Sequence, residues 1–152
     1  MKLKLAVIAL SFLAISCGPN EQEQKRIEKG ESVMAVHDDV MPQMGVLTKK
    51  RSEIKDAIQQ LKADTTQPFD SAWEEKAVEV MVKLQKANDD MMDWMHEYRY
   101  PDDKVSFDDA MTYMEEQHQA ISDVRDQTEQ AIKDADEILK QAAEKAHNHE
   151  NE

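Results

Sequence analysis

Residues that favour β-sheets, tight turns or disulfides are scarce in this 152-residue sequence. It contains one cysteine, three glycines, four prolines and few aromatic residues. A single cysteine excludes an intramolecular disulfide, so packing alone must stabilise the folded part. No run of alternating β-branched residues is present, which argues against a β-sheet protein. Glu, Lys, Gln, Ala, Asp and Met dominate instead, and this composition favours helices.

Basic residues are also in the minority, with 19 Lys and Arg against 32 Asp and Glu. Nucleic-acid binding requires clustered basic residues, so we exclude nucleic acid as a partner. The acidic balance also disfavours flat binding to an anionic membrane. A His-Glu-x-x-His motif, a Gly-rich phosphate loop and a nucleophile elbow are all missing. We therefore predict that the protein is not an enzyme and has no catalytic residues.

The cysteine, Cys17, follows a segment typical of secretion. Lys2 and Lys4 precede a short apolar run that ends at Leu13, and small or aliphatic residues lead up to Cys17. The run is too short to cross a bilayer, which needs about 20 apolar residues. It predicts a signal peptide over residues 1–16. The position of the cysteine resembles the lipobox of bacterial lipoproteins, which implies cleavage before Cys17 and acylation of that residue, with palmitate among the acyl groups.

After the signal peptide we expect a lipidated cysteine and polar tether over residues 17–32, a helical domain over residues 33–146 and a disordered tail over residues 147–152. Gly30 marks either a break before the first helix or a position inside a helix that begins earlier. Gly18, rather than Asp, follows Cys17, so inner-membrane retention is not signalled and we expect an outer-membrane anchor, facing either side.

Apolar residues recur at alternating steps of four and three over three segments, which predicts heptad-like seams on three long helices. The first seam has two polar interruptions, and Pro42 is expected to kink or break its helix. The first seam comprises Val33, His37, Val40, Met44, Leu47, Arg51, Ile54, Ile58 and Leu61; the second Trp73, Ala77, Val80, Leu84, Ala87, Met91, Trp94 and Tyr98; the third Phe107, Met111, Met114, His118, Ile121, Arg125, Thr128, Ile132, Ala135, Leu139, Ala142 and Ala146.

Short connections between long helices make sequential helices antiparallel, so the fold class predicted is all-α, an elongated up-down-up three-helix bundle. Ser71 and Ser106 are the expected caps of the second and third helices. The antiparallel second helix is expected to extend along the third helix only as far as the level of Asp134. The part of the third helix after Asp134 is therefore expected to be an overhang. A long hairpin that oligomerises is the structural alternative.

This topology gathers methionine and histidine side chains at one end of the bundle. Counting from the connections places His37 level with Trp94 and Met111, and His118 level with Met44. Thioether and imidazole groups suit Cu(I), so one hypothesis is a copper or zinc site. The alternatives are ordinary core packing and a Met-lined groove for a partner. The candidate metal ligands are His37, Met44, Met91, Met111, Met114 and His118.

Three short segments carry a resemblance to a family. These are the run from Met34 to Gly45, Trp94-Met95-x-x-Tyr98 and Tyr113-Met114-x-x-Gln117. The chain resembles small Bacteroidota lipoproteins, some of which carry the label "viral A-type inclusion protein". The resemblance implies an envelope location and a helical, coiled-coil-like fold. It implies no activity and no functional residues.

The sequence thus predicts an envelope protein that is anchored by lipid at Cys17 and binds or scaffolds another envelope protein, without a cofactor. Copper or zinc binding at the methionine-rich end is the second hypothesis, and an envelope stress chaperone is the third.

Overall fold

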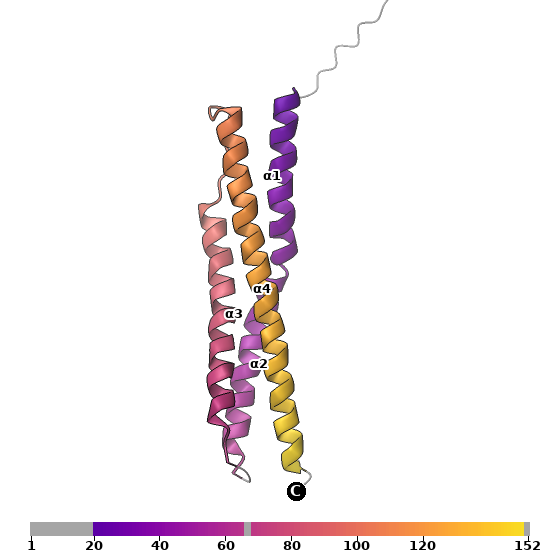
Figure 1. Ribbon diagram of the computed structural model, residues 1–152, viewed down its shortest axis with the longest axis vertical. Coiled ribbons are helices and arrows are strands. Elements are labelled where there is room, and N and C mark those ends of the chain that lie inside the picture. The colour runs from indigo at the N-terminus through magenta and orange to yellow at the C-terminus, as the bar shows by residue number, and fades with distance from the viewer. Residues whose placement is uncertain (1–19, 66–67, 151–152) are drawn as a thin grey trace, which may run out of the picture.

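The computed structural model describes residues 20–65 and 68–150, which are helical apart from short connections. Four helices follow one another: α1 (Glu21–Val40), α2 (Gln43–Ala63), α3 (Ser71–Glu97) and α4 (Phe107–Glu150). α1 and α2 are joined end to end and together form the first long helix of the bundle (Figure 1). The predicted all-α, three-helix bundle is confirmed. The predicted signal peptide and Cys17 lie outside the described residues.

α4 is the central helix, because it packs against α1, α2 and α3. It contains 44 residues and is therefore about 66 Å long at 1.5 Å per residue. α1 and α2 run beside α4 in the same direction, and α3 runs in the opposite direction (Figure 1). Ion pairs join Lys29 to Glu115 and Lys50 to Asp136, so α1 and α2 keep a constant offset of 86 residues from α4 (29 to 115, 50 to 136).

The break between α1 and α2 lies at Met41 and Pro42, as the sequence predicts. The Met41 amide donates to the His37 carbonyl at 2.9 Å, whereas Pro42 has no amide hydrogen to continue the helix. The Met44 amide donates to the Met41 carbonyl at 3.2 Å, which forms a tight turn at the junction. The chain therefore changes direction between α1 and α2 without leaving the bundle.

Side-chain caps fix the starts of α3 and α4. The Asp70 carboxylate accepts a hydrogen bond from the Trp73 amide at 3.0 Å, so the cap of α3 is Asp70 and the prediction of Ser71 is wrong by one residue. The Ser106 hydroxyl accepts from the Asp109 amide at 3.2 Å, which confirms the predicted cap of α4. Both α3 and α4 thus begin where a short polar side chain satisfies free amides.

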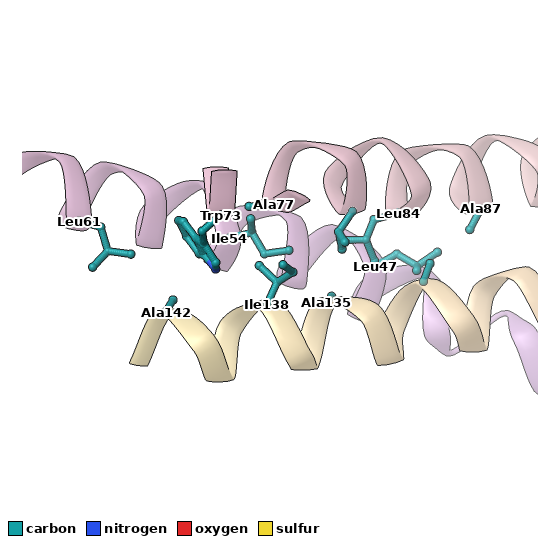
Figure 2. Close-up of a cluster of buried hydrophobic side chains, with 12 residues drawn as sticks. Leu47, Ile54, Leu61, Trp73, Ala77, Leu84, Ala87, Ala135, Ile138 and Ala142 are labelled. Atoms are coloured by element: carbon teal, nitrogen blue, oxygen red, sulfur yellow. The ribbon is translucent and has the colours of Figure 1, made fainter. Parts of the chain in front are cut away.

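Two apolar clusters lie in the two halves of the rod. The α1 half comprises residues 20–41 and 89–126, and the α2 half comprises the other described residues. In the α2 half, side chains from α2, α3 and α4 interdigitate around Ile54, Leu84 and Ile138 (Figure 2). In the α1 half, the buried cluster consists of Val33, Val36, Val40, Met91, Trp94, Ile121 and Val124. Each cluster joins all the long helices, and together they hold the bundle along its length.

Three boundaries differ from the sequence-based predictions. α1 begins at Glu21, so most of the predicted tether over residues 17–32 is helix, and of the two alternatives for Gly30 the helix that begins earlier and runs through it is confirmed. α4 continues to Glu150, beyond the predicted start of a tail at residue 147. The overhang after Asp134 is also wrong, because Lys145 near the end of α4 pairs with Asp70 at the start of α3, at 2.7 Å. The C-terminal part of α4 is therefore supported by the α2–α3 end of the rod.

Candidate functional site

Aromatic side chains form a ladder through the α1 half, from α1 across α3 to α4. The His37 ring lies 5.8 Å from the Trp94 ring, and Trp94 stacks on Tyr98 at 4.8 Å. Tyr98 in turn stacks on Tyr113 at 6.4 Å. The predicted shared level of His37 and Trp94 is confirmed. Burial raises the pKa of the Tyr98 phenol, so this hydroxyl stays neutral at physiological pH.

His37 is held at the edge of this ladder by its sequence neighbour. Its Nδ1 atom lies 2.9 Å from the exposed Asp38 carboxylate. Since a carboxylate can only accept, Nδ1 is the donor in this contact. The ring is partly buried, so it forms part of the wall between α1 and α3.

A buried arginine ties α1 to the connection between α3 and α4. The Arg26 side chain is only 7% exposed, and one Nη atom donates to the carbonyls of Pro101 at 3.2 Å and Asp102 at 2.9 Å. Its other Nη atom donates to the carbonyl of Val105 at 3.4 Å. Arg26 therefore holds residues 101–105 through their backbones, which a neutral side chain of similar length could not do.

Gly30 lies one turn further along α1, against the same connection. A Cβ atom built on Gly30 would lie 2.5 Å from Cε2 of Tyr100, so the ring occupies the space of the missing side chain. Next to it, Lys29 pairs with Glu115 on α4, and this pairing lowers the pKa of the Glu115 carboxyl. The first three turns of α1 are thus attached to both α4 and the 98–106 connection.

The six residues predicted as metal ligands do not share one level of the bundle. With the offset of 86 residues, Met44 is level with residue 130 of α4, whereas Met111 lies 19 residues before that. The separation along the axis is about 28 Å at 1.5 Å per residue, which is too long for one metal ion. The predicted levels of Met111 with His37 and of His118 with Met44 are therefore wrong.

The physical cause of this error is the 98–106 connection. Tyr98 ends α3 but stacks on Tyr113, so the first two turns of α4 extend beyond the end of α3. The predicted levels assume a tight turn between α3 and α4 and count residues back from it, so they leave out this extension of α4. It shifts every α4 residue toward the N-terminal end of α1 relative to the prediction.

Individually, the predicted ligands occupy varied environments. Met91 and Met114 are fully buried, and Met91 lies within the apolar cluster of the α1 half. Met44 is partly buried and packs against both clusters. Met111 and His118 are partly buried on α4. Of the six, Met44 packs against the α1-half cluster that contains Met91, and His37 contacts Trp94 of the same cluster. Within the described residues, no three His, Cys, Asp or Glu side chains are grouped to hold a metal ion.

A different set of methionines lies together on the surface of the α1 half. Met34 and Met41 of α1 are each 37% exposed, and Met92 of α3 is 41% exposed. Met34, His37 and Met41 have the spacing i, i+3, i+7, which places them on one face of α1. Met95, three residues after Met92, packs against the cluster that contains Trp94, the ring partner of His37. We call Met34, His37, Met41, Met92 and Met95 the methionine face.

The sequence offers a Met-lined groove for a partner as one alternative, but the predicted seams do not indicate which methionines are exposed on it, although the helical spacing of residues 34, 37 and 41 is visible in the sequence. The predicted seams give each helix one buried stripe of residues. Met34, Met41 and Met92 each lie one position after a residue of such a stripe. Their grouping depends on which sides of α1 and α3 turn toward each other.

The negative charge of the chain is concentrated in the same half. Residues 20–41 and 89–126 contain 18 Asp and Glu against 6 Lys and Arg, a net charge of −12. The remaining described ranges, 42–65, 68–88 and 127–150, contain 13 acidic and 11 basic residues, a net charge of −2. The α1 half therefore presents a strongly negative field, and the α2 half is nearly neutral.

None of the described helices is both long and apolar enough to cross a membrane. Comparisons with family models, with curated proteins and with solved structures gave no match to this chain.

Proposed function

We propose that this protein is a lipoprotein of the bacterial cell envelope, anchored through Cys17, and that its helical rod is a non-catalytic module that binds or scaffolds another envelope protein. The anchor belongs to the outer membrane in this proposal, because the residue after Cys17 does not signal inner-membrane retention. The observation that carries the proposal is the distance between the predicted acylation site and the first helix. α1 is capped by Asn20, only three residues after Cys17, and its cap accepts from the Glu23 amide at 2.9 Å.

This short spacing has a mechanical consequence. A flexible tether of 16 residues would let the domain reorient freely, whereas the two residues between Cys17 and the cap Asn20 confine the start of α1 to the bilayer surface. The clamp between Arg26 and the 101–105 backbone then stiffens the first turns. The α1 half becomes the membrane-proximal half, and the α2–α3 connection lies about 66 Å away, at the far end of α4.

The surface also supports a binding role. Eight large apolar side chains in the described residues are at least 36% exposed: Met34, Met41, Val46, Val78, Val82, Met92, Tyr100 and Val105. Four of the eight are methionine or tyrosine, which are enriched in protein–protein interfaces. A rod that bears them along its length suits a scaffold, since it offers contact surface at defined distances from the membrane.

The test is a crosslinking scan in cells. A photo-reactive amino acid is placed singly at each of these eight positions in the full-length, acylated chain. The proposal predicts an adduct of one defined mass at neighbouring positions on one face, and its loss when Cys17→Ser releases the chain from the membrane. Random adducts at all positions, or no adduct at any position, would contradict a binding or scaffolding role.

A further inference from the structure

The methionine face suggests the chemistry of the partner, and this inference rests on the proposed binding function. We infer that the partner contributes a basic amphipathic helix, which docks along the α1 half between α1 and α3. The docking residues on this chain are the exposed methionines Met34, Met41 and Met92.

The backbones of α1 and α3 lie further apart than those of the other helix pairs in the described part of the chain. Cα atoms of α2 come within 8 Å of both α3 and α4, whereas no Cα atom of α1 comes within 8 Å of one in α3, although side chains of both helices share the buried cluster of the α1 half. In Figure 1, α4 lies between α1 and α3 in the α1 half, and α1 diverges from α3 above the break. Only side chains, such as His37 against Trp94, connect α1 with α3. A fourth helix could pack here against both of them.

Methionine is well suited to such a surface. Its unbranched, polarizable side chain adapts to different apolar partners, and methionine-lined faces accept amphipathic helices by this property. The contact between His37 and Trp94 fixes the levels of the antiparallel helices α1 and α3 relative to each other. Two residues before Trp94, Met92 is therefore level with residue 39, between Met34 and Met41. The three exposed side chains span about 10 Å of helix axis, which is two turns and matches i, i+3, i+4 and i+7 anchors of a docked helix.

Acidic residues flank these methionines. Glu31 and Asp38 lie three residues before and four residues after Met34, on the neighbouring surface of α1, and both are exposed. Asp89 precedes Met92 by three residues, and Asp93 follows it directly; both are exposed. The docked helix is therefore expected to carry Lys and Arg beside its apolar stripe.

The same charge disfavours two other occupants. A second copy would bring two surfaces of net charge −12 together, which like-charge repulsion opposes. An anionic bilayer would be repelled for the same reason. A basic helix gains from both the apolar contacts and the electrostatic field, so it is the occupant that the surface favours.

The test measures peptide binding by fluorescence anisotropy. The mature acylated protein is held in phosphatidylcholine nanodiscs, whose zwitterionic lipid does not attract cations, and empty nanodiscs serve as the blank. The probe is a labelled peptide of about 20 residues, with Leu at i, i+3, i+4 and i+7 and Lys at the flanking positions. A matched peptide carries Glu in place of Lys.

We expect the Lys peptide to bind and the Glu peptide not to bind. The triple variant Met34→Gln, Met41→Gln, Met92→Gln should weaken binding by about tenfold or more, because it removes the apolar contacts. The control Val78→Gln, Val82→Gln changes two α3 side chains that are 47% and 64% exposed but lie outside the methionine face, and should change affinity less than about twofold. Glutamine is a good helix former, so both variants should keep the wild-type circular dichroism spectrum.

Equal weakening in both variants, equal binding of both peptides, or no binding of the Lys peptide would overturn the inference. A dimer of this chain that forms with concentration and is lost in the triple variant would also overturn it, because it would assign the face to a second copy. If the peptide does not bind while crosslinking in cells still gives a defined adduct at other positions, the binding function stands and only this docking face is wrong.

Discussion

Arg26 offers the sharpest test of how the α1 half is held together. The change is Arg26→Met, which keeps an unbranched side chain of similar length but removes the guanidinium. Three backbone carbonyls then lose a donor, and two of the three bonds have ordinary hydrogen-bond lengths of 2.9 and 3.2 Å. Hydrogen bonds to a charged group contribute about 1.5–3 kcal/mol each.

The net loss is smaller than the sum of these bonds, because the substitution also removes a buried cation whose Nε has no partner in the structure. Burying such a group costs free energy, and this cost is relieved in the variant. We therefore expect Arg26→Met to lower the free energy of unfolding by about 2–4 kcal/mol. The assay is urea denaturation followed by circular dichroism at 222 nm.

The control is Arg125→Met on α4. The Arg125 side chain is 35% exposed and pairs with the exposed, adjacent Asp126 at 2.8 Å, so its loss should change stability by less than about 0.5 kcal/mol. Hydrogen exchange gives a local readout: Arg26→Met should deprotect the bonded amides of Arg99 and Val105 and leave those near Ile54 unchanged. An Arg26→Met variant as stable as the control, or a uniform loss of protection, would refute the clamp.

Three further predictions follow from single sites. Gly30→Ala should leave the free energy of unfolding of the wild type unchanged or lower it, because the new Cβ meets the Tyr100 ring. In a Tyr100→Ala background the same change should stabilise the protein by about 1 kcal/mol. A stabilising effect of the same size in both backgrounds would show that no clash exists. Thr128→Val should raise the free energy of unfolding by about 1 kcal/mol, since its hydroxyl is fully buried and has no hydrogen-bond partner in the structure; a loss in urea denaturation would indicate a bond that the hydroxyl does make. The pKa of the Asp134 carboxyl is lowered from 3.8, mainly by its hydrogen bond from Lys83. The stabilising contribution of Asp134 is therefore present above the pKa of the unfolded state and is lost as the pH falls through the pKa of the folded state. Carboxyl NMR titration should show a higher pKa of Asp134 in Lys83→Gln, and an unchanged pKa would contradict the pairing of Lys83 with Asp134.

Seam periodicity predicted α3 best. All seven of its buried residues are members of the predicted seam, from Trp73 to Trp94. α3 has one buried stripe along its length, and alternating steps of four and three describe such a stripe well.

The prediction for α4 was less accurate, for a structural reason. Met114, Ile121, Thr128, Ala135 and Ala142 are buried as predicted, whereas Ala146 is exposed and the other six residues of the predicted seam are partly buried. Ala110, Val124, Ala131 and Ile138 are buried instead, one residue before the predicted positions. α4 contacts all three other helices, so its buried face is wider than a seam between two helices and includes neighbouring positions.

The start of α1 and the methionine face could not be predicted from periodicity. The segment over residues 21–32 is polar, and its buried residues are Arg26 and Gly30, neither of which carries an apolar signal. Arg26 is buried because backbone carbonyls of a distant connection accept its hydrogen bonds. The methionine face depends on how α1 diverges from α3. Pro42 in the sequence predicts a break in the first helix, but it does not predict the direction that the chain takes after the break.

The central claim is that the chain is anchored by lipid at Cys17, because this places the α1 half beside the membrane. The most direct test is the intact mass of the protein extracted from bacterial membranes, with peptide mapping of its N-terminus. The proposal predicts a chain that begins at Cys17 and carries acyl groups on that residue, and a Cys17→Ser variant that carries none. A chain that still begins at Met1, or one whose Cys17 is absent or unmodified, would contradict the proposal and remove the basis for a membrane-proximal α1 half.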